Sequence, residues 1–327
     1  MAEINLVALP TAFDLSHAVR KLRARHLELL RLLGTEKTVR AASSRMSLTQ
    51  PALSKMLKEL EDAFGAQLFM RSHSGVVPTP AGSHLIVYAT AALNGLAAAG
   101  NDVSRIAGGE AASLRLGTFS VMPCVPRAIA RMTQKDQSVT VQVKEGHGVA
   151  LLAAMAAGEI DCLIAALPPE LLQQSDVKAL RIETLYEDEV CVVASPKHPL
   201  TRVRALGWNQ LDGYRWALPP QESLLRRAVI DMHMRAGIVP PSPVAEMMSP
   251  ILLTELLVLD SSLLGVMRLE QASVEQGNGR IRRLRIVQKT PLPPMSLITA
   301  RQVGPREHLI QMLLDAIRIE VRAGLLH

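Results

Sequence analysis

The sequence is poor in the residues that carry metal and redox chemistry. Its 327 residues include three cysteines, and these are far apart: Cys124, Cys162 and Cys191. No two of them form a C-x-x-C pair, so neither a disulfide framework nor a zinc site is expected. The nine histidines have no H-x-x-x-H spacing, which argues against any other metal site. The sequence therefore predicts a protein of the reducing cytoplasm that holds no metal and no cofactor.

Long apolar runs are absent as well. The richest run, Ile251–Leu259, is interrupted by Thr254 and Glu255 and is far shorter than the roughly 20 residues of a membrane span. The first thirty residues contain Glu3 and Asp14 and do not resemble a signal peptide. A content of 48% hydrophobic and 20% charged residues is typical of a globular chain. We therefore expect a soluble protein of two or three domains that does not contact a membrane.

Positive charge is concentrated at the N-terminal end. The formal net charge of the chain is +6, and residues 1–80 contain eleven lysines and arginines against seven acids. This first quarter of the chain therefore carries four of the six excess charges. A local excess of this sign favours a polyanionic partner such as DNA.

Residues 21–64 have the pattern of three short helices. Apolar residues at three- and four-residue steps predict a first helix that ends at Gly34. Thr38 is the predicted N-cap of a second helix, Val39–Met46. Thr49 is the predicted N-cap of a third helix, with Pro51 in its first turn, where a missing amide hydrogen costs nothing. Three helices with a tight turn before the third satisfy the requirements of a helix-turn-helix, and residues 67–79 fit a small hairpin after it.

The third helix has one apolar and one polar face. On the polar face Gln50, Ser54 and Lys58 are spaced four residues apart, flanked by Pro51 and Lys55. Glutamine reads adenine edges in the major groove, serine contacts bases or phosphates, and lysine neutralises phosphate. The alternative is an ordinary solvated helix surface. The preceding helix, the turn, the hairpin and the local charge together favour DNA.

A long helix is predicted from Pro80. Its apolar residues alternate between four- and three-residue steps without a break, which is the pattern of a seam between two helices. The alternative is a helix that lies on its own domain. The residues of this predicted seam are Leu85, Ala89, Ala92, Leu96, Ala99, Val103 and Ile106.

Beyond Gly108 and Gly109, predicted strands and helices alternate. This order is typical of open α/β folds with parallel sheets. The predicted strands are residues 114–119, 139–144, 162–166, 190–195, 216–218, 264–267 and 297–300. The predicted helices are residues 126–132, 149–157, 224–236, 251–259 and 306–322.

The segment Val39–Ser54, which reads VRAASSRMSLTQPALS, closely resembles the LysR-type transcriptional regulators. KELEDAFGAQLFMR and TPAGSHL extend the match, which runs from Lys21 to Leu85. Weaker correspondences continue with EGHGVALLAAMAAGEIDCLIA and MMSPILLTELLV. The family's usual serine before the Gln-Pro pair is Thr49 here, which retains the hydroxyl cap.

The resemblance implies two parts: an N-terminal all-α winged helix-turn-helix with a long linker helix, and a C-terminal α/β effector domain of the periplasmic-binding-protein type with two subdomains. The implied limits are 21–79 for the DNA-binding domain and 80–108 for the dimerisation helix. Residues 111–189 with 290–327 would form effector subdomain I, and residues 190–289 subdomain II. The implied partners are double-stranded operator DNA, a small anionic effector, further copies of the chain in a dimer or tetramer, and RNA polymerase as a further candidate. The implied DNA-contacting residues are Thr49, Gln50, Pro51, Ser54, Lys55, Lys58 and Arg71.

The effector contacts carried over from the family are Ser120, Val121, Gly148, Ser223 and Ser249. The last three are expected at the starts of helices, where free amide groups favour a carboxylate or phosphate. Family members often have a hydroxyl residue where Val121 and Gly148 stand. Ser223 and Ser249 fit equally well as plain helix caps.

The sequence is also compared with what two other function classes require. An enzyme would need a catalytic constellation, and no Ser/His/Asp set, phosphate-binding glycine loop or carboxylate pair stands out, so no catalytic residue is predicted. An architectural DNA-binding protein would not need the long α/β region. Cys124, in the predicted loop after the first strand, was considered as a redox-sensing thiol, although no cationic partner is evident.

Overall fold

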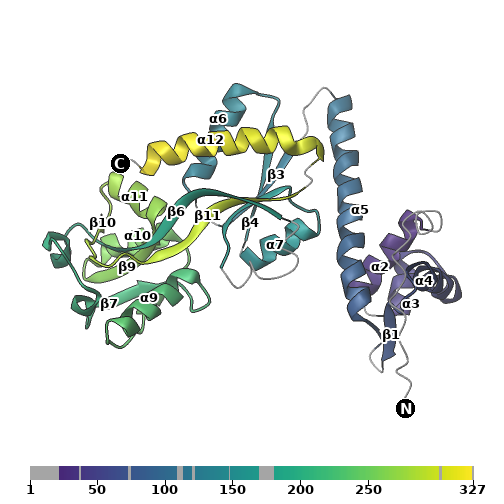
Figure 1. Cartoon of the computed structure of the whole chain (residues 1–327), viewed down its shortest axis with the longest axis horizontal. Coiled ribbons are helices and arrows are strands. Elements are labelled where there is room, and N and C mark those ends of the chain that lie inside the picture. Colours follow the sequence, from purple (N-terminus) through teal and green to yellow (C-terminus); the bar gives the residue numbers. More distant parts are fainter. Residues whose placement is uncertain are drawn as a thin grey trace, which may run out of the picture. The chain divides into compact units, whose positions relative to one another are not determined.

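The computed structural model describes residues 22–36, 38–72, 75–108, 113–119, 122–146, 148–168, 180–301 and 304–325. The chain divides into two compact units (Figure 1). One comprises residues 1–103 with 156–159, and the other comprises residues 104–155 with 160–327. Within the described part of the chain, no helix has both the length and the apolarity needed to cross a membrane.

The first unit contains the three predicted short helices, α2 (Ala24–Glu36), α3 (Val39–Arg45) and α4 (Gln50–Phe64). The prediction that the first helix ends at Gly34 is wrong. The helix continues to Glu36, and Gly34 instead allows close packing, since a Cβ there would lie 3.1 Å from Cγ2 of Ile86. The buried residues shared by these helices include Leu29, Leu30, Leu33, Ala42, Leu53 and Leu60.

The predicted caps are confirmed. The hydroxyl of Thr38 accepts a hydrogen bond from the amide of Ala41 at 3.2 Å, and that of Thr49 accepts one from Ala52 at 3.4 Å. Helix α4 ends at Gly65, whose φ of 61° is left-handed. These caps fix where α3 and α4 begin, and hence the angle at which α4 leaves the turn.

The hairpin after α4 is present as β1 (Phe69–Ser72) paired antiparallel with β2 (Gly75–Pro78). Helix α5 (Pro80–Ala107) follows directly and packs tightly against the hairpin. The hydroxyl of Thr79 accepts a hydrogen bond from the amide of Gly82 at 3.0 Å. A Cβ on Gly82 would lie 1.9 Å from the carbonyl oxygen of Leu68, so only glycine fits there.

The predicted seam on α5 divides into two parts. Leu85 and Ala89 pack into the core of the helix-turn-helix, so for them the alternative of packing on the helix's own domain is correct. The later seam residues are exposed, with Leu96 65%, Val103 66% and Ile106 61% accessible. Their apolar side chains remain uncovered within one chain.

The second unit is built on one nine-stranded sheet. Its strands are β3 (Ser113–Thr118), β4 (Thr140–Glu145), β5 (Cys162–Ala166), β6 (Leu180–Ala194), β7 (Arg215–Leu218), β8 (Ala245–Glu246), β9 (Leu263–Arg268), β10 (Arg282–Arg283) and β11 (Pro291–Ala300). The order is β4-β3-β5-β11-β6-β9-β7-β8, with β10 also paired to β6. The expectation of parallel sheets is only partly right, because β6 and β11 pair antiparallel with each other and with their neighbours.

Strands β6 and β11 join the two halves of this unit. Residues 180–189 of β6 pair with β11, whereas residues 190–194 pair with β9. The register of β11 shifts between Leu292 and Met295 and again before Ser296. We call β3, β4 and β5 with their helices the first half, and β7, β8, β9 and β10 with theirs the second half. Each half has buried apolar clusters of its own.

The predicted helices of this unit are present with small shifts of their ends. The α-helices are α6 (Cys124–Lys135), α7 (Gly148–Ala156), α9 (Leu224–Arg235), α10 (Pro250–Leu259), α11 (Leu269–Gly277) and α12 (Glu307–Leu325). The 3₁₀ turns are η2 (Pro199–Arg202), η3 (Trp208–Leu211) and η4 (Gly304–Arg306). Helix α11 and strands β8 and β10 were not predicted.

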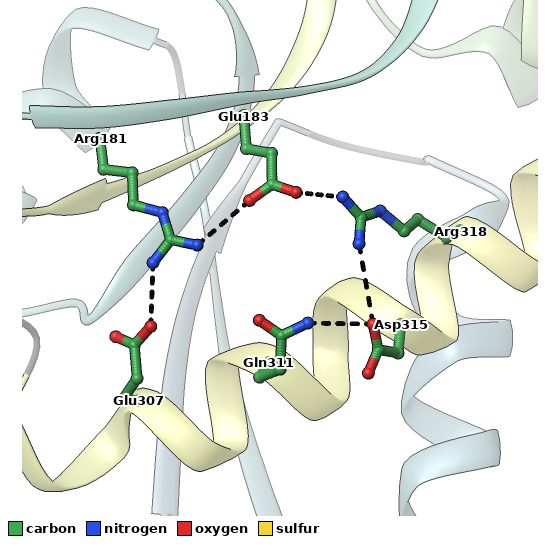
Figure 2. A network of polar contacts seen from close by, with 6 residues as sticks. All are labelled: Arg181, Glu183, Glu307, Gln311, Asp315 and Arg318. Atoms are coloured by element: carbon green, nitrogen blue, oxygen red, sulfur yellow. Dashed lines mark hydrogen bonds and ion pairs between the residues drawn. The ribbon is translucent and has the colours of Figure 1, made fainter.

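The C-terminal helix α12 packs against α6 and against β6. Figure 2 shows the polar network that joins α12 to β6. Arg181 on β6 contacts Glu183 at 3.4 Å and Glu307 on α12 at 2.9 Å, and Glu183 also pairs with Arg318 of α12. The last element of the chain thereby returns to the first half.

Candidate functional site

The polar face of α4 is exposed as predicted. Leu53 and Leu60 are buried on the opposite side of this helix. The side chains that face solvent are those of Thr49, Gln50, Pro51, Ser54, Lys55 and Lys58. Six adjacent exposed residues at the start of a capped helix form the kind of surface that enters a major groove.

This face is positive because it holds two lysines, whereas the acids of α4 all follow Lys58 in the sequence. The carboxylate of Glu61 accepts a hydrogen bond from the amide of Leu68 at 2.8 Å. That of Glu59 lies 3.3 Å from Nε2 of His26. Within the described residues, neither Lys55 nor Lys58 pairs with an acid, so both charges are available to phosphates.

Arg71, the remaining predicted DNA contact, lies in β1 of the hairpin. Its backbone pairs with Val76, and its side chain lies outside the described part of the structure. The hairpin therefore places this position on the wing, separate from α4.

The predicted effector residues fall at corresponding strand ends in the two halves. In the first half, β3 and β4 are adjacent and parallel. Gly148 begins α7 after β4, and the segment that follows β3 contains Ser120 and Val121, which lie outside the described residues. In the second half, β7 and β8 are adjacent and parallel, and Ser223 and Ser249 begin the helices that follow them.

Both serines act as helix caps. The hydroxyl of Ser223 accepts a hydrogen bond from the amide of Arg226 at 3.0 Å, and that of Ser249 accepts one from Leu252 at 3.4 Å. The plain capping role is thus present in the structure. A contact of either residue with an effector remains a prediction.

A buried arginine stands behind the cap of α9. Arg226 is 5% exposed, and its Nη2 donates to the carbonyl of Pro241 at 3.4 Å. Its Nε and Nη1 have no hydrogen-bond partner among the described residues. The first turn of α9 therefore combines a helix dipole with a largely unneutralised cation, an environment suited to an anion.

Sequence reasoning missed a cluster of ionisable residues where the two halves meet. Glu270 is 4% exposed and accepts hydrogen bonds from the amide of Cys124 at 2.6 Å and the hydroxyl of Tyr186 at 2.8 Å. Asp188 pairs with Arg268. The available signal was the charged pair Arg268 and Glu270, at the end of the buried strand β9 and directly after it.

Burial is the largest influence on the pKa values of Glu270, Cys124 and Tyr186. It raises the pKa of Glu270, although the hydrogen bonds from Tyr186 and from the Cys124 amide act in the opposite direction. Burial, followed by the charge of Glu270, also raises the pKa of the Cys124 thiol. Redox-sensing cysteines have a lowered pKa and an accessible thiol, so the structure does not support that alternative.

Two further features lie apart from the predicted contacts. A cavity of about 480 Å³ lies at the carboxyl end of α9, lined by residues that include Trp208, Arg235 and Lys289. None of the described effector candidates lines it. Among the described residues, no three His, Cys, Asp or Glu side chains are placed to hold a metal ion.

Two family models match the chain. Residues 24–83 match the bacterial regulatory helix-turn-helix protein, lysR family, and residues 107–320 match the LysR substrate binding domain. The first match covers the exposed face of α4, and the second covers the nine-stranded sheet. Together they extend over both compact units.

Curated relatives are transcriptional regulators. The HTH-type transcriptional regulator GbpR of Azospirillum brasilense is 30% identical over 235 residues, which are 71% of this chain and 68% of that protein. GalR of Pseudomonas putida is 29% identical over 287 residues, which are 86% of this chain and 68% of that protein. Both are named as HTH-type transcriptional regulators.

Solved structures share the fold. Full-length OxyR from Pseudomonas aeruginosa, in a variant form, has a TM-score of 0.58 at 22% identity and covers 91% of this chain and 98% of its own. CbnR, a LysR family transcriptional regulator, has a TM-score of 0.55 at 16% identity, with coverages of 93% and 99%. The winged helix-turn-helix, the long helix and the two-part α/β domain therefore belong to one known architecture. The chain is a member of the LysR family of DNA-binding transcriptional regulators, with a substrate-binding domain of that family.

Proposed function

We propose that the protein changes transcription at its operator when a small anionic effector binds between the two halves of its α/β unit. The observation that carries this proposal is the matching position of two strand pairs. β3–β4 in the first half and β7–β8 in the second half each end next to predicted effector residues. Ligands of open α/β folds bind at such carboxyl ends. The unit then acts by binding a molecule, without converting it.

The negative charge that we propose for the effector is inferred from residues of the second half. Ser223 and Ser249 each begin a helix, and helix amino ends carry partial positive charge. Arg226 adds a buried guanidinium, two of whose nitrogen atoms have no hydrogen-bond partner in the described part of the chain. A carboxylate or phosphate group would compensate this charge, whereas a cation would be repelled.

On the DNA side, we propose that Gln50 and Ser54 read base edges. The residues that would position the domain against the DNA backbone are Thr49, Pro51, Lys55, Lys58 and the wing residue Arg71. We further propose that chains pair through the exposed part of the α5 seam, with a tetramer formed from two such dimers. The protein would meet operator DNA, and RNA polymerase as a further candidate partner, in the cytoplasm.

We also propose the limits of the working parts. The DNA-binding domain would comprise residues 21–79 and the linker helix residues 80–108. Effector subdomain I would comprise residues 111–189 with 290–327, and subdomain II residues 190–289. The change of pairing partner along β6 between Glu189 and Val190 supports the second boundary.

The test uses a change that keeps the cap but repels an anion. Aspartate is as good an N-cap as serine, so Ser223→Asp should leave the fold intact while placing a negative charge at the proposed site. The probes are a panel of small carboxylates and phosphate esters, screened for a saturable rise in Tm. We expect at least one probe to stabilise the parent protein and to fail with Ser223→Asp.

The matched control is Asn278→Asp, which adds the same charge at an exposed position directly after α11 in the same half. This control should respond to the probe like the parent. If Ser223→Asp binds the anion as tightly as the parent, the effector does not lie at this helix end. If no carboxylate or phosphate ester raises the Tm of the parent protein but a small organic cation screened in the same way does, the proposed negative charge of the effector is wrong.

A further inference from the structure

Two helices at the meeting point of the halves begin without a side-chain cap of their own. The N-cap of α6 is Pro123 and that of α11 is Arg268, and neither side chain accepts a hydrogen bond from its helix. The first amides of a helix have no partner within it. At a buried helix start these amides need an acceptor from another part of the chain.

Carboxylates from elsewhere supply the missing acceptors. Asp188 on β6 accepts a hydrogen bond from the amide of Leu269, the first residue of α11, at 3.1 Å. Glu270, in the first turn of α11, accepts one from the amide of Cys124, the first residue of α6, at 2.6 Å. The start of each helix is therefore completed by a residue outside that helix.

The second of these contacts joins the two halves. Helix α6 follows β3 in the first half, and α11 follows β9 in the second half. Cys124 and Glu270 are 146 residues apart in the sequence, and both are buried. The hydroxyl of Tyr186 on β6 holds the other oxygen of Glu270 at 2.8 Å. The guanidinium of Arg268 lies 5.1 Å from the ring centre of Phe119, which follows β3.

We propose that Glu270 is a latch residue, which holds the two halves of the α/β unit together by capping α6 of the first half from α11 of the second. Separation of the halves removes the acceptor from the Cys124 amide and leaves the Glu270 carboxylate without its backbone donor. The arrangement in which the two halves are in contact is thereby favoured over one in which they are separated, without any bound molecule.

A regulatory consequence follows if the proposed function holds. The latch contact at Cys124 is three residues from Val121 in the sequence, so it adjoins the segment that would contact the effector in the first half. An effector that separates or rotates the halves must break the latch contact. Its apparent affinity is then the intrinsic affinity multiplied by the fraction of molecules that are unlatched.

The cysteines provide a direct test in the full-length protein. Cys124 lies at the latch, Cys162 in the core of the first half and Cys191 in the core of the second half, and all three are buried and free. The experiment measures the rate of N-ethylmaleimide labelling of each by peptide mass spectrometry. It compares the parent protein with Glu270→Ala, Glu270→Gln and the control Glu255→Ala, which changes an exposed glutamate of α10.

Glu270→Ala should label at Cys124 about tenfold faster than the parent or more, because a buried amide loses its acceptor. Cys162 and Cys191 should remain as protected as in the parent. Glu270→Gln retains an acceptor oxygen but also lacks the charge that raises the pKa of the Cys124 thiol, so it measures the effect of charge alone and should label more slowly than Glu270→Ala. Glu255→Ala should label like the parent. Unchanged protection of Cys124 in Glu270→Ala would overturn the proposal.

Labelling alone does not distinguish a latch from a local cap, so unfolding of the two halves is followed separately. Both tryptophans, Trp208 and Trp216, are buried in the core of the second half, and Cys162 reports the first half. In urea the two probes should give coincident midpoints for the parent and separate midpoints for Glu270→Ala. If Glu270→Ala labels faster at Cys124 but the two probes still give the same urea midpoint, Glu270 only caps α6 locally and does not hold the halves together. Neither readout needs an effector or DNA, so a failed effector screen leaves this test intact.

Discussion

Asp188 accepts a hydrogen bond from the amide of Leu269 and also pairs with Arg268, the residue before it. Its side chain is fully buried in this position, and that of Arg268 is nearly so. Removal of one member of a buried pair leaves the other charge without compensation. We expect Asp188→Ala to lower the free energy of unfolding by about 3–5 kcal/mol, measured by urea denaturation.

The control for this prediction is a surface pair. Lys289 is 80% exposed and lies 3.3 Å from Glu189. Lys289→Ala should change stability by less than about 1 kcal/mol, because solvent screens such pairs. An equal loss in both variants would mean that burial does not distinguish them.

Gly82→Ala should destabilise the DNA-binding domain severely. The added Cβ would lie 1.9 Å from the Leu68 carbonyl oxygen, a backbone atom that cannot turn away. We expect a lower Tm and loss of DNA binding. In the same helix, Gly95 has no atom within 4 Å of a Cβ, so Gly95→Ala should gain up to about 1 kcal/mol from helix propensity. A Gly82→Ala protein as stable as Gly95→Ala would contradict the close packing.

Sequence-specific contacts of α4 with DNA can be distinguished from non-specific electrostatic binding. Gln50→Ala and Ser54→Ala should each cost about 1–3 kcal/mol of discrimination between operator and random DNA. Lys58→Ala should weaken both kinds of binding and reduce the salt slope by about one. The operator is found by selection from random duplexes, and affinities are measured at several salt concentrations. Three variants that bind operator like the parent would show that α4 does not enter the groove.

The exposed part of the α5 seam predicts an interface between copies. Leu96→Asp places a charge in this seam, where burial against a second helix would leave it unpaired. Sedimentation should therefore show monomers for Leu96→Asp. Asn101→Asp, at another exposed position of α5, should assemble like the parent. Unchanged assembly of Leu96→Asp would place the interface elsewhere.

Glu270 should contribute to the pH dependence of stability. Its pKa is raised from the usual 4.5, chiefly by burial, while Tyr186, Cys124 and Arg127 also face it. Above pH 4.5 the folded protein therefore binds more protons at this site than the unfolded chain does. The free energy of unfolding falls as pH rises through this window, until the folded carboxyl is ionised.

Glu270→Gln removes this titration and leaves the other groups in place. The free energy of unfolding of the variant minus that of the parent should consequently increase as pH rises above 4.5. Urea denaturation at several pH values measures this difference. A difference that is independent of pH would show that Glu270 titrates alike in both states.

Local patterns predicted most of the first unit. Thr38 and Thr49 were identified as caps because the cap and the amide that it binds are three residues apart in sequence. The exposed and buried faces of α4 follow from the helical period in the same way. The prediction that the first helix ends at Gly34 is wrong, because the role of this glycine depends on Ile86, fifty-two positions away.

The missed parts of the second unit have the same cause. The first ten residues of β6 include four acids and Arg181, and two of these charged residues, Arg181 and Glu183, belong to the polar network with α12 (Figure 2). Helix α11 is short and rich in polar residues. The contact of Glu270 with Cys124 joins residues 146 positions apart, and no local pattern specifies such a pairing.

The register shifts in β11 surround two prolines, Pro293 and Pro294. Proline has no amide hydrogen, so these two positions have no donor to lose when the strand bends. The ladders on either side, from Pro291 to Leu292 and from Ser296 to Ala300, have regular pairing. The strands that connect the halves thus contain a break of about two residues in their pairing, which the sequence itself specifies through Pro293 and Pro294.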